Sequence, residues 1–309
     1  MIKHLKRSLI VRYLTCPYCF NKSRLVSGRN SFWCKECKRH YKYKNNIIRF
    51  INPKELDKET SRELKGNSFA LSKKNIDHYA LKDNWSDYYN FFVEQKIKHL
   101  LFYLDQTKCK TIASLGSGPG FELKEILKKR KISLVLSSDL ALSATSVVPV
   151  TLKHYDTTLC LFTSDLRLSP VVSNNSVLIL VYEALHHTGD IHGAINTLLQ
   201  KKYKHIIIVE PCTNFLIRIL AKFGVAQREE YSGVIPDFLD IRTLRNLCKK
   251  NNYQVQVNTI WEIPEGYFRL IVKRGSILEK FILRLIMSMS VVTNIFGVGS
   301  FAIAYLNKK

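Results

Sequence analysis

Apolar and polar positions in residues 109–309 follow two periods. Short apolar runs between polar or glycine-containing segments predict buried strands, and apolar residues three and four positions apart predict amphipathic helices. Strands and helices alternate, which is typical of a parallel sheet with helices on both faces. We expect strands in KTIASL, ISLVLSSD, SVLILVYE, HIIIVEP, YQVQVNTIWEI and SFAIAYL, and helices in FELKEILKKR and DFLDIRTLRNLCKKN.

The pattern changes upstream of this region. Residues 85–105 have helical periodicity, with Ser86 or Asp87 placed as the N-cap. Residues 53–84 are polar and mixed in charge, and we expect them to connect two units. The sequence therefore predicts a small N-terminal unit over 1–52, a linker and helical lead-in over 53–108, and an α/β domain over 109–309.

The C-terminal segment between Arg284 and Lys308 contains no charge and is nominally long enough to span a bilayer. Gly297 and Gly299 interrupt it, and GSFAIAYL alternates like a strand. We favour a buried helix followed by a core strand. The segment ILEKFILRLIM has an apolar stripe with Lys280 and Arg284, so residues 277–292 suit packing on a sheet and peripheral contact with a membrane surface equally well.

The composition is ordinary for a soluble globular protein, with 46% hydrophobic and 24% charged residues in a chain of 309. The net charge of +23 is not ordinary. It favours phosphate-bearing partners such as nucleic acid, anionic lipid or a nucleotide-linked substrate, and a solvated lysine-rich surface gives the same composition. Scattered single cysteines and the absence of a secretory signal at the N-terminus predict a cytoplasmic protein.

Two C-x-x-C pairs, CPYC at 16–19 and CKEC at 34–37, are separated by fourteen residues. Two such pairs can place four thiolates around one zinc ion with no open coordination position. We therefore predict a structural Zn²⁺ site formed by Cys16, Cys19, Cys34 and Cys37, in a ribbon that the metal stabilises.

Residues 1–50 hold thirteen Lys and Arg residues against one acid, with aromatic residues between them. Such a surface can bind RNA, and it can equally be a solvated exterior. The pattern L-x-CPYC…FWCKEC…YKYKNNIIRFI resembles the short zinc-binding domain fused ahead of many prokaryotic methyltransferases. It is similar to the ribbon of the large-subunit ribosomal RNA guanine methyltransferase and to the small activator protein of tRNA and protein methyltransferases.

The stretch SLGSGPGFE, residues 114–122, follows a predicted strand and precedes a predicted helix. Glycines in such a turn let backbone approach a ligand closely. Their spacing is G-x-G-x-G, so the dinucleotide pattern G-x-G-x-x-G is not met. The stretch resembles the first motif of class I S-adenosylmethionine-dependent methyltransferases, which implies a Rossmann-like methyltransferase sheet and S-adenosylmethionine as cofactor.

Further segments resemble this family in the expected order. Asp139 ends the second predicted strand, where a carboxylate can accept both ribose hydroxyls. Asp165 stands where the family places an acid that binds the adenine amino group, and YEALHHTGD resembles the segment after the fourth strand. The resemblance implies cofactor binding by the following residues: Gly116, Ser117, Gly118, Gly120, Asp139, Leu140, Asp165, Leu166 and Tyr182.

Two positions depart from the family pattern. Ser114 stands where the family usually has an acid that anchors the amino end of the cofactor, and the acid that usually opens the fourth strand is missing from NNSVLIL. These losses favour weak cofactor binding or, as an alternative, a non-catalytic binding module on a methyltransferase fold.

Histidines after the fourth strand suit the deprotonation of an acceptor. His187, or else His186, is the expected general base, although such side chains often only hydrogen-bond backbone and Asp190 suits an N-cap. YEAL differs from the Asn/Asp-Pro-Pro-aromatic motif of adenine-amino enzymes, and Cys212 follows the wrong strand for cytosine-carbon chemistry. We expect methylation of an oxygen or nitrogen on a small-molecule, saccharide or lipid-linked acceptor. The alternative is an rRNA or tRNA base bound through the basic ribbon, and no DNA partner is expected.

Overall fold

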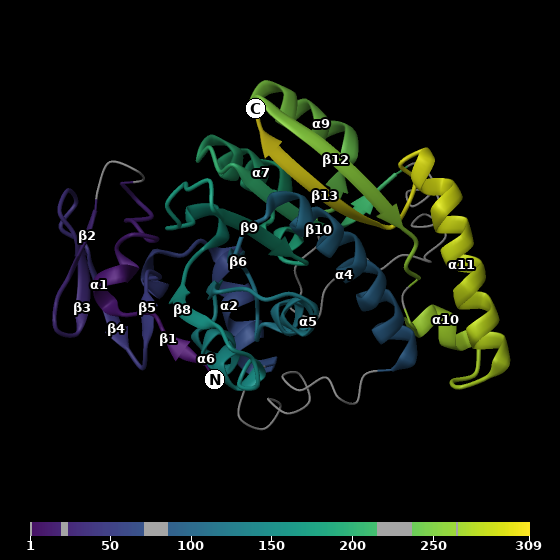
Figure 1. The fold of residues 1–309 in the computed structure, drawn as a ribbon, viewed down its shortest axis with the longest axis horizontal. Helices are drawn as coiled ribbons and strands as arrows, with labels where there is room; N and C mark the ends of the chain where they lie inside the picture. Colours follow the sequence, from purple (N-terminus) through teal and green to yellow (C-terminus); the bar gives the residue numbers. More distant parts are fainter. Residues whose placement is uncertain (1, 20–23, 71–85, 215–236, 264) are drawn as a thin grey trace.

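The computed structural model describes residues 2–19, 24–70, 86–214, 237–263 and 265–309 (Figure 1). The N-terminal unit and its bridge contain β1 (Lys3–His4), α1 (Arg7–Ile10), β2 (Leu25–Ser27), β3 (Ser31–Cys34), β4 (His40–Lys44), β5 (Ile47–Arg49), the 3₁₀ turn η2 (Pro53–Glu55) and α2 (Lys58–Ala70). Residues 71–85, the rest of the predicted linker and the start of the predicted lead-in helix, lie outside the described residues.

The larger unit alternates helices and strands, as the apolar pattern predicts. Its first half contains α4 (Asp87–Thr107), β6 (Thr111–Leu115), α5 (Phe121–Lys129), β7 (Leu134–Asp139), α6 (Leu142–Thr151), β8 (Thr158–Thr163) and η3 (Leu166–Leu168). Its second half contains β9 (Val177–Tyr182), η4 (Leu185–Thr188), α7 (Ile191–Gln200), β10 (His205–Thr213), β11 (Leu239–Asp240), α9 (Ile241–Lys250), β12 (Tyr253–Ile260), α10 (Glu265–Ile271), α11 (Ile277–Ile295) and β13 (Phe301–Lys308).

Several helix starts have the caps that the sequence predicts. Ser86 caps α4 by accepting a hydrogen bond from the backbone N–H of Tyr89 at 3.2 Å. Asp190 caps α7 in the same way, accepting from the N–H of Gly193 at 2.8 Å. Both side chains satisfy backbone donors that the first helical turn leaves without partners.

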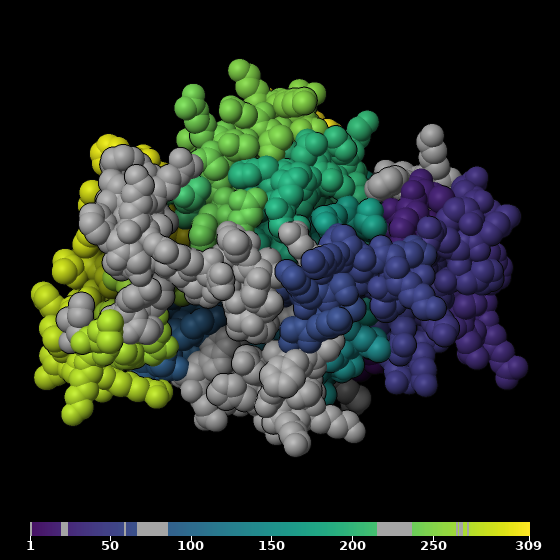
Figure 2. Space-filling model, turned by 180° about the vertical axis from the view of Figure 1, so that it is seen from behind, coloured from purple at the N-terminus to yellow at the C-terminus, as the bar shows by residue number. Residues whose placement is uncertain are grey.

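One sheet runs through the molecule in the order β12-β13-β10-β9-β6-β7-β8-β5-β4-β3-β2. Strands β6 to β10 pair in parallel, and β13 is antiparallel to both of its neighbours. The ribbon continues this sheet because β5 pairs in parallel with β8, with Ile47 opposite Leu161. The ribbon and α11 form opposite ends of the molecule (Figures 1 and 2).

Alternate residues of the strands point into two buried cores. On one face, residues such as Ile112 and Val135 pack with α4, α5 and α11. On the other face, Ala113 and Leu136 share a core with α7, α9 and the ribbon, whose Phe50 ring lies 6.0 Å from the ring of Phe162. Helices therefore cover both faces, as predicted, and the ribbon shares a core with the larger unit.

The C-terminal segment contains the expected core strand, β13. The helix before it, α11, is buried along one face only, where Leu283 and Ile286 pack on the sheet. In the described part of the chain, no helix has both the length and the apolar character needed to cross a bilayer.

Candidate cofactor and acceptor site

The glycine loop between β6 and α5 forms one wall of the candidate site. Gly116 has φ +70° and Gly118 has φ +50°, in the left-handed region that other residues rarely adopt. A Cβ on Gly116 would lie 2.5 Å from Cβ of Ala184, so glycine is needed for packing there. Among the described residues, no atom lies within 4 Å of a Cβ built on Gly118. The loop therefore leaves a stretch of backbone open to a ligand.

Asp139 ends β7 and lies against this backbone. Its Oδ2 accepts a hydrogen bond from the N–H of Gly118 at 2.9 Å, and its Oδ1 accepts one from the N–H of Ala141 at 2.8 Å. The side chain is buried, and burial raises the pKa of its carboxyl to about 6 even though both hydrogen bonds favour the ionised form. Asp139 is therefore a fixed carboxyl group beside the glycine loop.

A cavity of about 180 Å³ lies at the carboxyl ends of β6 to β9, where open α/β sheets bind their ligands. The sequence-predicted residues that line it are Gly116, Gly118, Asp139, Leu140, Asp165, Leu166 and His187. The lining residues that sequence reasoning missed are Thr60, Glu63, Ser164, Arg167, Glu183, Ala184 and Thr188. The buried Oγ of Ser164 has no hydrogen-bond partner among the described residues, so it offers a polar contact to a ligand.

Asp165 is held by a neighbouring arginine. The guanidinium of Arg167 lies 2.6 Å from Oδ2 of Asp165, and the same Nη2 also donates to Asp57 at 2.8 Å and to Oγ1 of Thr60 at 2.6 Å. Asp57 and Thr60 lie at the start of α2. Arg167 therefore fastens α2 against the cavity, a role that the polar sequence of this helix does not indicate.

The two predicted histidines have different positions. Nδ1 of His186 lies 2.7 Å from Oε2 of Glu210, which is fully buried and accepts from the N–H groups of Ala184 and Leu185 through Oε1. His186 therefore helps to hold the loop after β9. His187 lines the cavity, and its Nδ1 lies 3.7 Å from Oε1 of Glu63 in α2. Of the pair, only His187 forms part of the cavity wall.

A buried charge cluster adjoins the cavity at Glu183. Nζ of Lys96 lies 2.8 Å from Oε1 of Glu183 and 2.6 Å from Oε2 of Glu262. Burial alone would lower the pKa of Lys96, but the two carboxylates outweigh it and hold this pKa above its ordinary value. Glu183 has φ +50°, a costly conformation for a residue with a side chain. The cluster places one cation and two carboxylates at the wall of the cavity that Glu183 forms.

A second cavity of about 350 Å³ lies between α4 and α5 and is lined by Tyr89, Glu122 and Tyr182, among others. Oγ of Ser114 donates to Oε1 of the buried Glu122 at 2.8 Å. The hydroxyl of Tyr182 is buried without a hydrogen-bond partner among the described residues, and burial raises its pKa. Tyr182 thus lies beside this second cavity, away from the first.

Two other predicted residues do not line either cavity. Oγ of Ser117 lies 2.6 Å from Oγ of Ser137, in the interior beneath the loop. Gly120 is the N-cap residue of α5. Both shape the loop from below, and neither reaches its open side.

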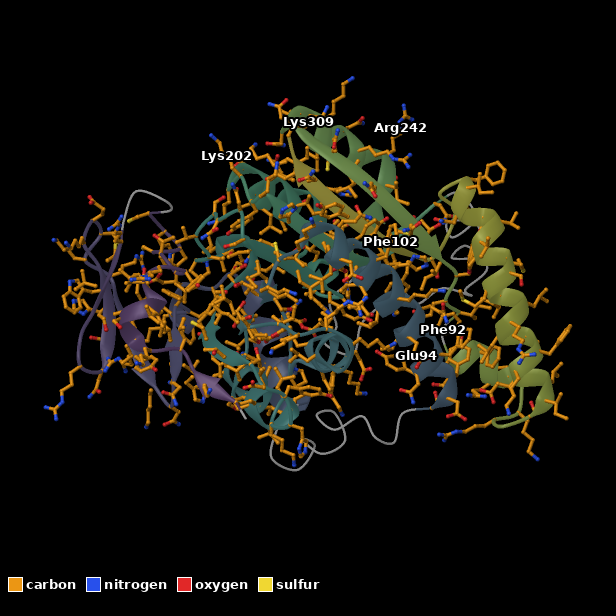
Figure 3. The ribbon with its side chains drawn as sticks, in the orientation of Figure 1. Phe92, Glu94, Phe102, Lys202, Arg242 and Lys309 are labelled. Carbon is orange, nitrogen blue, oxygen red and sulfur yellow. The ribbon has the colours of Figure 1, made fainter. Side chains whose placement is uncertain are left out.

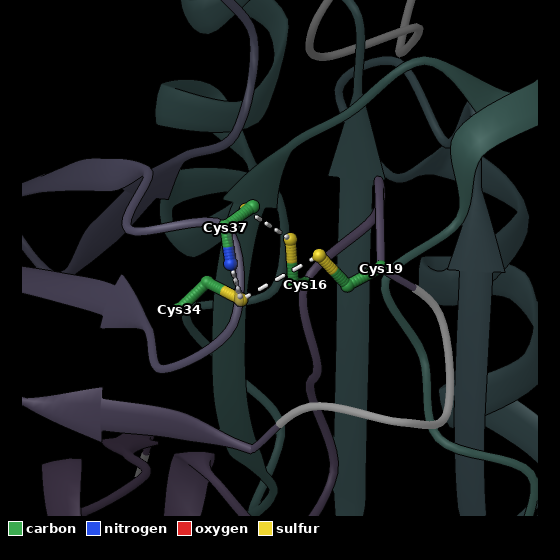
Figure 4. Close-up of side chains that lie close together, drawn as sticks. All are labelled: Cys16, Cys19, Cys34 and Cys37. Atoms are coloured by element: carbon green, nitrogen blue, oxygen red, sulfur yellow. Dashed lines mark hydrogen bonds between the residues drawn. The ribbon is translucent and has the colours of Figure 1, made fainter.

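The four predicted metal ligands come together in the ribbon (Figure 4). Their sulfur atoms all lie within 4.8 Å of one another, and the pairs Cys16–Cys37 and Cys19–Cys34 are separated by 3.7 Å. The hydroxyl of Tyr41 lies 2.9 Å from Sγ of Cys16. The cluster could hold a metal ion. The remaining cysteines, Cys109, Cys160, Cys212 and Cys248, are free and buried.

A third cavity, of about 600 Å³, lies between the ribbon, η2, α2 and the start of α6. Lys42 and Arg49 line it and stand opposite each other on the β4–β5 ladder, where like charges repel. Glu55 also lines it, but its Oε2 is paired with Arg39 at 2.7 Å. The cavity therefore carries an excess of positive charge.

No family model matches the sequence, and no curated protein matches it significantly. Solved structures do resemble it. Magnesium protoporphyrin IX methyltransferase from Synechocystis PCC 6803 aligns at 10% identity over 80% of this chain and all of its own, with a TM-score of 0.51. The chain has the Rossmann-like α/β fold of this methyltransferase.

Other solved methyltransferases and related chains are similar at lower scores. YcgJ from Bacillus subtilis aligns at 11% identity over 70% of this chain and 99% of its own, with a TM-score of 0.47. Phosphoethanolamine N-methyltransferase 2 from Haemonchus contortus aligns at 10% identity over 79% of this chain and 60% of its own, with a TM-score of 0.42.

Proposed function

We propose that the protein is an S-adenosylmethionine-dependent methyltransferase that acts on an oxygen or nitrogen of a small-molecule, saccharide or lipid-linked acceptor. The observation that carries the proposal is the contact between Gly118 and Asp139, 2.9 Å from N–H to carboxylate, beside a cavity at the carboxyl ends of the parallel strands. A nucleoside ligand needs both features, an uncovered backbone and a carboxylate for its ribose hydroxyls.

The residues of the site fit this cofactor. Gly118 leaves space above the loop, Asp139 has lone pairs free to accept from ribose, and Oγ of Ser164 lacks a partner among the described residues. Asp165 would accept from the adenine amino group while sharing its oxygens with Arg167. The cavity is smaller than the ~300 Å³ at which ligand pockets begin, so we infer that α2 moves outward when the cofactor enters.

When bound, the sulfonium centre supplies an electrophilic methyl group. The task of this chain is to align the acceptor and to remove its proton. His187 is the proposed base because it lines the cavity, and the Glu63 carboxylate 3.7 Å away attracts the positive charge that His187 gains with the proton. Glu183 and its buried partner Lys96 would orient a donor group of the acceptor.

The experiment that tests this function uses the whole protein and labelled S-adenosylmethionine. Fractions of cell RNA, lipid and small metabolites are incubated separately, and each is analysed for transferred label. We expect label in the lipid or metabolite fraction. Transfer to the RNA fraction alone would contradict the first choice of acceptor, and transfer to none, together with absent cofactor binding, would contradict catalysis.

The third cavity favours RNA as the second candidate acceptor. Lys42 and Arg49 face each other there, and within the described part of the chain neither forms an ion pair with an acid. The buried Nε of Arg49 also has no hydrogen-bond partner among these residues. Phosphates of an RNA backbone would satisfy both cations. If so, Lys42→Gln and Arg49→Gln should weaken RNA binding and reduce its salt dependence, whereas Lys44→Gln on the same strand should not.

We further propose that the four cysteines hold a structural Zn²⁺. A tetrahedral site with Zn–S bonds of about 2.3 Å separates its sulfurs by about 3.8 Å. The Cys16–Cys37 and Cys19–Cys34 separations of 3.7 Å match this value. Four protein ligands leave no position for a substrate, so the ion would stabilise the ribbon and take no part in the chemistry.

A further inference from the structure

The outer face of α11 is an exposed apolar stripe. We call it the α11 face and define it by Ile277, Phe281, Leu285, Met289, Val292 and Phe296, which recur every three or four residues. All six are exposed, Ile277 to 88% and Phe296 to 76%. Among the described residues outside 270–296, the only other large apolar side chains with such exposure are Phe102 and Val150. Among the described residues, the exposure is therefore concentrated on α11 and the end of α10, at the edge of the molecule (Figure 1).

The opposite face fixes this helix on the sheet. Leu283 and Ile286 are buried, and Oγ of Ser290 accepts from the N–H of Trp261 at 3.0 Å. Oδ1 of Asn294 accepts from the N–H of Thr259, at the end of β12, at 2.6 Å. The α11 face is therefore presented by a well-packed helix, and its exposure does not arise from a helix that has come away from the core.

Charges around the face have one sign. Lys273, Arg274, Lys280 and Arg284 are exposed, whereas the two acids of this region, Glu265 and Glu279, are paired with Arg269 at 3.0 and 2.8 Å. An apolar stripe bordered by cations suits a surface that is apolar inside and anionic outside. A second copy of the chain would bring cations against cations, which opposes self-association.

We propose that the α11 face docks onto the surface of a lipid bilayer that contains anionic lipids. The helix would lie in the plane of the interface, with the apolar stripe among the acyl chains and the four basic side chains at the headgroups.

Docking would bring the candidate site near the membrane. Glu262 lies between β12 and α10, and Lys96 joins it to Glu183 on the cavity wall. Trp261, the neighbour of Glu262, donates its N–H to Oγ of Ser290 on α11, so the ion cluster on the cavity wall adjoins a contact that holds α11. The further step, that the acceptor is a membrane-resident amphiphile, rests on the proposed methyltransferase function.

Vesicle flotation with the full chain tests the docking without any cofactor. The probes are phosphatidylcholine vesicles with and without phosphatidylserine. The double variant Phe281→Ser, Leu285→Ser removes two central side chains of the face, and Phe102→Ser, an exposed phenylalanine on α4, is the matched control (Figure 3). We expect the wild type and the control to float with the anionic vesicles. The double variant should bind these vesicles at least about tenfold more weakly.

The charge contribution is tested separately. Lys280→Gln with Arg284→Gln should remove most of the preference for anionic over neutral vesicles, and added salt should do the same to the wild type. Equal flotation of the double apolar variant and the wild type would overturn the proposal. So would a concentration-dependent dimer, measured by light scattering without vesicles and abolished by the same variant. Thermal unfolding of each variant shows that it is folded. S-adenosylmethionine binding is measured separately, so failure of docking is distinguished from failure of the proposed function.

Discussion

The hydroxyl of Ser114 donates a 2.8 Å hydrogen bond to Oε1 of Glu122. Ser114 lies in β6, where the methyltransferases that the sequence resembles usually carry an acid, and Glu122 belongs to the first turn of α5. Both side chains are buried. The carboxylate that is missing from the strand is therefore present one turn into the following helix, beside the same glycine loop.

Glu122 lines the second cavity, and we expect the amino end of S-adenosylmethionine to reach that cavity. Glu122→Gln should therefore weaken cofactor binding by roughly tenfold or more, since a buried carboxylate that meets a cationic amino group is worth about 1.5–3 kcal/mol. Ser114→Ala, which only removes the hydroxyl that orients it, should have a smaller effect. Glu125→Gln is the matched control, because Glu125 lies on the same helix and pairs with Lys128 at the surface. Calorimetric titration measures all three, and unchanged affinity in Glu122→Gln would show that Glu122 does not bind the cofactor.

Cofactor affinity should fall as the pH drops through about 6. The pKa of Asp139 is raised to about 6 by burial, and only its ionised form can accept from both ribose hydroxyls. Cofactor binding therefore favours the ionised form of Asp139. The affinity for the cofactor should be highest above this pH and should decrease below it. Titrations between pH 5 and 8 should also detect proton release on binding near pH 6, and a profile that is flat in the wild type would contradict this assignment.

The two histidines should respond differently to substitution. His187→Gln should lower kcat by about 10²-fold or more with little change in stability, because the side chain lines the cavity and is the proposed base. His186→Gln should instead lower the free energy of unfolding by about 1–3 kcal/mol, since Oε2 of the fully buried Glu210 loses its imidazole partner while Oε1 keeps its two backbone donors. Thermal unfolding and steady-state kinetics distinguish these outcomes, and a reversal of the two effects would contradict the assignment.

Removal of zinc should destabilise more than the ribbon. Phe50 packs on Phe162, and β5 pairs with β8 inside the main sheet, so unfolding of the ribbon would expose the edge of that sheet. We expect one zinc per chain by elemental analysis and a clearly lower Tm after chelation or in Cys34→Ser. Cys248→Ser, a buried cysteine outside the cluster, serves as the control for thiol loss. An unchanged Tm on complete metal removal would contradict a structural role.

Much of the architecture could be predicted from the sequence because its strands are buried on both faces and therefore appear as continuous apolar runs. The glycine loop, Asp139 and the cysteine cluster were found for a similar reason, since each is a local pattern with a fixed spacing. The strand β8 and the helix α6 were not predicted, because their apolar runs are short and lack clear boundaries.

Other features depend on contacts between distant segments. The α2 segment reads as a polar linker, and only its position against Arg167 makes Thr60 and Glu63 part of the cavity. The pairing of β5 with β8 joins residues more than one hundred positions apart. The difference between His186 and His187 depends on Glu210, which comes from the next strand. No local pattern contains this information.

Calorimetric titration of the purified full chain with S-adenosylmethionine, beside Asp139→Ala, tests the central claim most directly. The account predicts saturable binding of one cofactor per chain and a loss of about tenfold or more in affinity for the variant, because two ribose hydroxyls lose their common acceptor. No measurable binding by the wild type, or equal affinity in the folded variant, would contradict it.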